Sequence, residues 1–139
     1  LLELLTQDLL DAIVICPSNP FVSISPIIQL PGVRDAMRNS SAVVVAVSPI
    51  VAGLAIKGPA AKMMHELSMP ASAAAVADYY GDLLDGFVLD QADEQCALLV
   101  EASGLPLLKT HTVMRSLQDR IDLASEVLRF CEQITGNNK

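Results

Sequence analysis

Short apolar runs alternate with longer amphipathic stretches along this chain. Four runs rich in Val, Ile and Leu are typical of strands buried on both faces: 12–16, 42–47, 86–90 and 106–109. Longer stretches with helical spacing predict helices at about 27–39 (interrupted near Pro31-Gly32), 60–67, 71–80, 91–103 and 113–133. Because strands and helices alternate over short connections, we expect βαβ units and a parallel sheet flanked by helices.

The last of these helices carries apolar side chains at steps of four and three: Leu117, Ile121, Ala124, Leu128 and Cys131. That spacing predicts one apolar stripe facing the core. Residues 1–10 resemble the end of an amphipathic helix, and 53–59 are expected to form a loop. We assign 1–135 to a single α/β unit and 136–139, Gly-Asn-Asn-Lys, to a disordered tail.

The first strand runs into a stretch of prolines and small polar side chains. Pro17 stops the strand, and Pro20 and Pro26 stiffen the segment after it. Open α/β sheets bind ligands beyond the carboxyl ends of their strands, so this stretch is a candidate ligand loop. Its candidate binding residues, which could position a hydroxyl or a phosphate, are Ser18, Asn19 and Ser23.

A second polar loop begins at Ser48, directly after the second strand, and should open on the same edge of the sheet. Further on, Lys57 and Gly58 precede the helix expected at 60–67, which also carries Lys62. A lysine beside a helix N-terminus is a sound way to hold phosphate, so we regard Ser48, Lys57, Gly58 and Lys62 as candidate phosphate-binding residues. The segment is not a Walker loop, and a solvated loop lysine is the alternative interpretation.

Thr110 and Thr112 come after the fourth strand on either side of His111. They are candidate binding residues, but they could instead cap the last helix. No Cys or acidic residue stands at ligand spacing from His111, so we expect no metal site there. Three carboxylates bracket the third strand, and two of them, Asp82 and Asp85, are expected to serve turns or caps; the third is Asp90.

Composition and charge exclude several classes of protein. Nine basic against sixteen acidic residues leave a net charge of −7, which disfavours nucleic acid as a partner. No apolar run reaches the roughly 18 residues that a membrane helix needs. Three cysteines, Cys16, Cys96 and Cys131, lack CxxC or metal-like spacing, and the chain does not open like a signal peptide. We expect reduced, mostly buried thiols in a cytoplasmic protein.

Several longer motifs resemble the 2-phospho-L-lactate transferase family of deazaflavin coenzyme synthesis. The first motif is Pro-Ser-Asn-Pro-Phe-Val-Ser-Ile-Ser-Pro-Ile, at 17–27. The other motifs that match the family pattern are 30–34, 47–64, 80–90 and 114–124. The resemblance runs from about Asp11 to Phe130. Because members of that family are about twice as long, the chain resembles their carboxyl-terminal half.

The resemblance implies a Rossmann-like α/β fold in three layers and a homodimer. It implies transfer of a phospholactyl or phosphoenolpyruvyl group from a guanosine diphosphate-activated donor to the deazaflavin Fo, with GMP leaving. Mg²⁺ would assist, but its ligands are expected in the missing amino-terminal half, so we expect no metal site in this chain and no activity from it alone. Such chemistry depends on positioning and charge neutralisation, and we assign no catalytic residue.

Two positions depart from the family pattern. Cys16 stands where Gly is usual before the Pro-Ser-Asn-Pro run, and His111 stands where Asp is common between the two threonines. Distant relatives of this fold act as regulators, so the alternative is a non-catalytic protein that binds a nucleotide sugar or dinucleotide.

Overall fold

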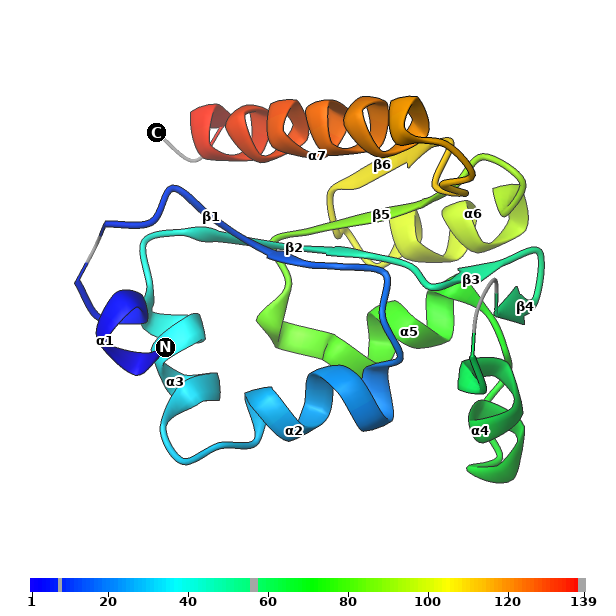
Figure 1. Ribbon diagram of the computed structural model, residues 1–139, viewed down its shortest axis with the longest axis horizontal. Coiled ribbons are helices and arrows are strands. Elements are labelled where there is room, and N and C mark those ends of the chain that lie inside the picture. The colour runs from blue at the N-terminus through cyan, green and yellow to red at the C-terminus, as the bar shows by residue number, and fades with distance from the viewer. Residues whose placement is uncertain (8, 56–57, 138–139) are drawn as a thin grey trace.

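The computed structural model describes residues 1–7, 9–55 and 58–137. The elements succeed one another as Figure 1 shows: α1 (Leu2–Leu5), β1 (Ala12–Ile15), a π-helix (Pro20–Ile24), α2 (Ser25–Ile28), α3 (Val33–Asn39), β2 (Val43–Val47), β3 (Ile50–Val51), β4 (Leu54–Ala55), α4 (Ala60–Glu66), α5 (Ala73–Tyr80), a 3-10 turn (Gly81–Leu83), β5 (Gly86–Asp90), α6 (Glu94–Ala102), β6 (Leu107–Thr110) and α7 (Leu117–Asn137). The four strands predicted from the apolar runs are all present as β1, β2, β5 and β6.

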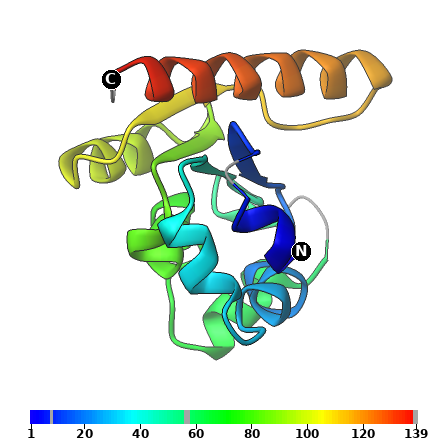
Figure 2. The same ribbon diagram turned by 90° about the vertical axis from the view of Figure 1, so that its left-hand side faces the viewer.

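Those four strands form one parallel sheet in the order β1-β2-β5-β6. Figures 1 and 2 show α7 alone along one face of the sheet and the remaining helices on the opposite side. The architecture is therefore a three-layer, Rossmann-like α/β fold, as expected. No helix in the described residues is long and apolar enough to cross a membrane.

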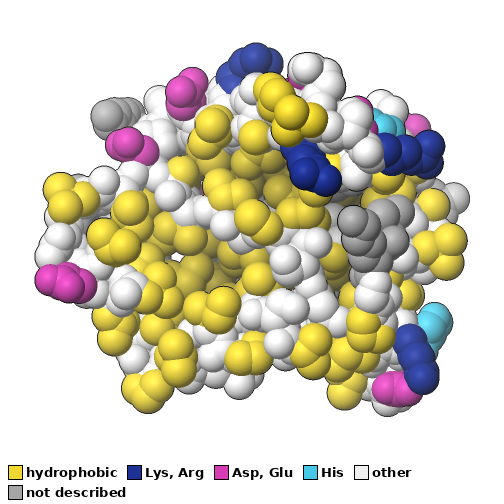
Figure 3. Space-filling model, viewed as in Figure 1, with side chains coloured by type: hydrophobic (Ala, Val, Ile, Leu, Met, Phe, Trp, Pro, Cys, Tyr) yellow, Lys and Arg dark blue, Asp and Glu magenta, His cyan; other side chains and the backbone are white. Residues whose placement is uncertain are grey.

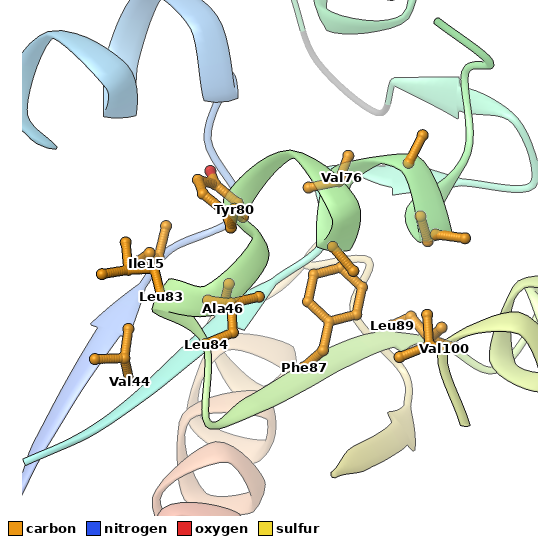
Figure 4. Packing of buried hydrophobic residues seen from close by; sticks show 14 of the residues in the cluster. Ile15, Val44, Ala46, Val76, Tyr80, Leu83, Leu84, Phe87, Leu89 and Val100 are labelled. Carbon is orange, nitrogen blue, oxygen red and sulfur yellow. The ribbon is translucent and has the colours of Figure 1, made fainter. Parts of the chain in front are cut away.

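Each face of the sheet has its own hydrophobic core, because successive strand side chains point to opposite sides. Figure 4 shows Phe87 and Leu89 of β5 on the same side as Val76 and Tyr80 of α5, in the larger core. The smaller core joins the other face to α7, and it includes Val45, Val47, Val88, Val127 and Phe130. Burial on both faces explains why β2 is apolar throughout and β5 is apolar up to its last residue, Asp90.

The chain after β1 becomes helical earlier than expected. Instead of one helix over 27–39, a π-helix begins at Pro20 and leads into α2 at Ser25. The Oδ1 of Asn19 starts this turn by accepting hydrogen bonds from the backbone N–H groups of Phe21 and Val22, at 2.9 and 3.3 Å. The break near Pro31-Gly32 is confirmed, since α3 starts at Val33 after Gly32 at φ +79°.

Three other boundaries differ from the sequence-based expectation. The expected loop at 53–59 contains β4, which pairs with β3 in a small antiparallel hairpin. The last helix starts at Leu117 instead of 113. It continues to Asn137, two residues into the segment 136–139 that we expected to be a disordered tail; 138–139 lie outside the described residues.

Of the apolar stripe predicted for the last helix, Cys131 faces the sheet and the other four members do not. Leu117, Ile121 and Leu128 are 70%, 48% and 57% exposed. The residues of α7 that pack into the smaller core are Leu123, Val127, Phe130, Cys131 and Ile134. The helix therefore carries two apolar stripes, and the predicted one lies mostly on the outer face and meets the core only at Cys131.

The cysteines are all free, but they are less buried than expected. Cys131 is buried, whereas Cys96 is half-buried and Cys16 is exposed at the end of β1.

Candidate functional site

The carboxyl ends of the four parallel strands meet at one edge of the sheet. β1 and β2 are neighbours in parallel register, so the loops that begin at Pro17 and Ser48 open on the same side, as predicted. A cavity of about 130 Å³ lies at this edge. Its lining comes from the segments that follow β1, β2 and β6, from β3 and from α7: Pro17, Ser48, Pro49, Val51, Thr112, Met114 and Arg120.

Ser48 is only 2% exposed, and its hydroxyl is already engaged. The Oγ donates to the carbonyl oxygen of Ile50 at 3.0 Å and accepts from the N–H of Ile50 at 3.1 Å. The side chain therefore shapes the turn between β2 and β3. Its hydrogen is used, so it can offer the cavity an acceptor and no donor.

Asp90 is a site residue to which the sequence analysis assigned no role. It ends β5 at 3% exposure and accepts from both the N–H and the hydroxyl of Thr112, at 2.8 and 3.1 Å. Its other oxygen accepts from the N–H of Ala92 at 3.0 Å. Burial alone would raise the pKa of Asp90, but the hydrogen bonds from Ala92 and Thr112 outweigh it and hold the pKa below its ordinary value. Asp90 thus remains ionised and fixes Thr112 at the cavity.

Asp93 lies one turn further, at the start of α6, and is 5% exposed. Its Oδ1 accepts from the N–H of Ala52 at 2.9 Å, which ties the β3–β4 hairpin to the end of β5. Its Oδ2 is buried without a hydrogen-bond partner in the described part of the chain. Burial raises the pKa of Asp93, and the nearby charge of Asp90 adds to that rise.

The candidate residues of the first loop serve mainly to shape it. The Oδ1 of Asn19 starts the π-helix, and its Nδ2 contacts the sulfur of Met63 in α4 at 3.4 Å. Ser18 is half-buried, and its N–H donates to the carbonyl oxygen of Cys16 at 2.6 Å. Ser23 is exposed within the π-helix. Of this loop, Pro17 lines the cavity.

Of the second loop, Lys57 lies outside the described residues, so its predicted phosphate contact stays a sequence-based prediction. Gly58 is exposed at φ +74° with open space around its Cα. Lys62 is exposed on α4 and faces Glu66 one turn on, 3.8 Å from its carboxylate. The structure therefore does not bring Gly58 or Lys62 to the cavity.

Thr110, the last residue of β6, and Thr112 do not cap the last helix, so that alternative is wrong. Thr110 donates its hydroxyl to Glu126 of α7, and Thr112 is held by Asp90. The cap is formed instead by Asp119, whose Oδ2 accepts from the N–H groups of Arg115 and Ser116 at 2.7 and 2.8 Å. Ser116 completes it by accepting from the N–H of Asp119.

Metal ions need groups of ligand side chains, such as those of His, Cys, Asp and Glu. No three His, Cys, Asp or Glu side chains of 1–7, 9–55 and 58–137 are grouped so that they could hold a metal ion. The expectation that the ligands of Mg²⁺ lie outside this chain stays a prediction.

A parallel α/β sheet with polar loops gathered at its carboxyl edge is typical of proteins that bind nucleotides and phosphate esters. Comparison with known proteins gives the family. The model of the family described as 2-phospho-L-lactate transferase CofD matches residues 7–126, and the chain belongs to that family.

Individual relatives agree with this assignment. The chain is 39% identical over 133 residues to a 2-phospho-L-lactate transferase of Methanosarcina barkeri, covering 96% of this chain and 42% of the relative. It is 36% identical over 121 residues to a 2-phospho-L-lactate transferase of Methanocaldococcus jannaschii, covering 87% and 37%. It is 38% identical over 125 residues to a phosphoenolpyruvate transferase of Kitasatospora aureofaciens, covering 89% and 39%. The chain thus matches well under half the length of each of these relatives.

Proposed function

We propose that this chain is part of a transferase that joins a phospholactyl or phosphoenolpyruvyl group to the deazaflavin Fo. The donor is the group activated as its guanosine diphosphate conjugate. The ribityl 5′-hydroxyl of Fo attacks the phosphorus that bears the lactyl or enolpyruvyl group, the bridging phosphorus–oxygen bond breaks, and GMP leaves with that oxygen. The hydroxyl proton is lost, and a phosphodiester forms.

The observation that carries the proposal is the family match over residues 7–126, which includes every loop at the carboxyl edge of the sheet. Phosphoryl transfer needs the reacting groups to be positioned and phosphate charge to be neutralised, more than it needs covalent help from the protein. The carboxyl edge of the sheet, held rigid by Asp90, Ser48 and Asn19, suits the positioning of the reacting groups. Any Mg²⁺ that assists charge neutralisation would be held by residues outside this chain.

The hydrogen bonds that the cavity hydroxyls already make indicate which kind of substrate group they can bind. Both hydroxyls donate within the protein: Ser48 donates to the carbonyl oxygen of Ile50, and Thr112 donates to the carboxylate of Asp90. Their free lone pairs suit a substrate hydroxyl, which donates, better than a phosphate, which accepts. We therefore assign these two side chains to a hydroxyl group of the acceptor, in place of the phosphate contact predicted from the sequence.

The test is an assay of the full-length protein that contains this chain. Fo is incubated with Mg²⁺ and the guanosine diphosphate conjugate of either phospholactate or phosphoenolpyruvate, and the product is detected by mass spectrometry. We expect a new phosphodiester of Fo together with GMP. The two donors are assayed separately because relatives carry both transferase names. Tight binding of nucleotide with neither product formed would contradict the proposal and support the non-catalytic alternative.

A further inference from the structure

Arg120 lies where two hollows of the surface meet. It is in the first turn of α7 and lines the 130 Å³ cavity at the carboxyl edge. It also lines an apolar groove of about 370 Å³ between β1 and α7, whose walls include Val14, Val47, Leu123, Val127 and Leu128. Among the residues that line the cavity, Arg120 is the one with a charged side chain.

The charge of Arg120 has no partner in the described part of the chain: no ion pair or hydrogen bond joins it to a carboxylate there. Arg34 and Arg38 both pair with Asp82, at 2.8 and 2.9 Å. Arg115 and Arg129 also have no ion pair among the described residues, but neither of them lines the cavity. The helical neighbours of Arg120 three and four positions away are uncharged: Ser116, Leu117, Leu123 and Ala124.

The nearest carboxylates in sequence and at the cavity are already engaged. Asp119 accepts the backbone N–H groups that cap α7. Asp90 is buried behind Thr112 and accepts three hydrogen bonds. What distinguishes Arg120 is therefore its place: an exposed guanidinium without a carboxylate partner lies at the mouth of the cavity in a chain with a net charge of −7.

We propose that Arg120 binds an oxyanion of the activated donor, a phosphate or carboxylate group, at this cavity. The hydroxyls of Ser48 and Thr112 donate within the protein, so the N–H groups of Arg120 are the side-chain donors that stay available at the cavity. A planar guanidinium binds such a group through two parallel hydrogen bonds. A volume of about 130 Å³ accommodates several non-hydrogen atoms, given that a water takes about 30 Å³ in the liquid. This assignment of a substrate contact rests on the function proposed above.

The kinetic test uses three variants of the full-length protein. Arg120→Ala removes the donors, Arg120→Lys keeps the charge without the planar fork, and Arg129→Ala removes an exposed arginine of the same helix that lines neither hollow. We expect Arg120→Ala to raise the KM for the donor roughly 10- to 100-fold with the KM for Fo unchanged, and Arg120→Lys to recover part of the loss. Arg129→Ala should match the wild type.

A binding test separates this proposal from the proposed function. Inorganic pyrophosphate and pyruvate are titrated calorimetrically into the wild type and the same variants, without turnover. Binding of pyrophosphate that is lost in Arg120→Ala identifies a phosphate site, and the same result with pyruvate identifies a carboxylate site. Either result stands even if no product of Fo is formed, in which case the proposed function alone fails.

Two outcomes would overturn the assignment. One is a donor KM and anion affinity in Arg120→Ala equal to those of the wild type. The other is a variant whose thermal stability falls while its anion affinity is unchanged, which would show that Arg120 pairs with another part of the full-length protein.

Discussion

At the scale of single residues, Asp90 holds the edge of the sheet together. It joins the end of β5 to the segment after β6 through two hydrogen bonds from Thr112, a residue 22 positions away. Because an ionised carboxylate accepts stronger hydrogen bonds than a neutral group, this contact fixes the path of the chain toward α7. The position of Arg120 at the cavity depends on that path.

Asp93 should make the stability of the protein depend on pH. Its pKa in the folded state is raised above the ordinary 3.8, so the folded state holds its proton more firmly than the unfolded chain does. Stability from this group is therefore present at low pH and is lost as the pH rises from about 3.8 through the folded pKa. The Asp93→Asn side chain keeps an acceptor for the N–H of Ala52 and cannot ionise. The free energy of unfolding of this variant, relative to that of the wild type, should therefore rise as the pH is raised from about 4 to about 7.

Urea denaturation at the two pH values measures the effect. Asp122→Asn, at an exposed position of α7, makes the same change of charge away from the buried network and serves as the matched control. A difference between Asp93→Asn and the wild type that stays constant with pH would contradict the expectation.

Lys57 carries a prediction that rests on sequence alone. If its ammonium neutralises phosphate charge, Lys57→Ala removes a charge-assisted contact of about 1.5–3 kcal/mol. That corresponds to roughly 10- to 150-fold in kcat/KM of the full-length protein, measured by steady-state kinetics. Lys139→Ala, outside every motif, is the control. Full activity in Lys57→Ala would show that Lys57 is a solvated loop residue.

At the scale of elements, the contact between β5 and α7 has almost no spare room. A Cβ added to Gly86 would lie 2.5 Å from the Cδ1 of Ile134 and 2.9 Å from the Cε1 of Phe130. Because Gly86 has no side chain, α7 can approach β5 closely at this position. Both contacted groups belong to the smaller core, so moving them disturbs the packing of the helix.

Gly86→Ala should therefore destabilise the protein by about 1–3 kcal/mol, the usual cost of overpacking. Gly136→Ala is the matched substitution within α7, where an added Cβ meets nothing within 4 Å. It should be neutral or stabilising by up to about 1 kcal/mol, because Ala is the better helix former. Chemical denaturation compares the two, and equal effects would show that the close approach at Gly86 has no energetic consequence.

At the scale of the whole molecule, the side that carries β1 is strongly apolar. Figure 3 shows hydrophobic side chains over much of the face on which β1 forms the near edge of the sheet. Within the described sheet, β1 pairs only with β2, so one side of this strand is unpaired. Val14 on β1 and Leu128 on α7 are exposed beside the β1–α7 groove. Apolar surface next to an unpaired strand edge favours association.

We expect the 139-residue chain on its own to self-associate through this side. Light scattering at high concentration measures the molar mass. Leu128→Lys should reduce association by placing a charge in the groove, whereas Leu98→Lys, on the exposed face of α6, should leave it unchanged. A monomer at high concentration would contradict this expectation. The same measurement on the full-length protein tests the homodimer that the resemblance implies.

The strands, the fold class and the family could all be predicted before any packing was known. β-branched apolar runs are buried wherever a parallel sheet is covered on both sides, so the amino-acid pattern was enough to locate β1, β2, β5 and β6. Short connections fixed the parallel arrangement and hence the shared edge of Pro17 and Ser48. The family could be recognised from long motifs that do not depend on three-dimensional contacts.

Packing between elements determined which face of α7 is buried and which side chains meet at the site. Both apolar stripes of α7 have helical spacing, and only the surface opposite the helix selects Leu123 and Val127 over Ile121 and Leu128. Likewise, the sequence offered Thr112 as a helix cap or a ligand, and Asp90, 22 residues away, gave its hydroxyl another partner. Periodicity describes one element at a time, whereas burial and hydrogen bonding depend on what other elements place beside it.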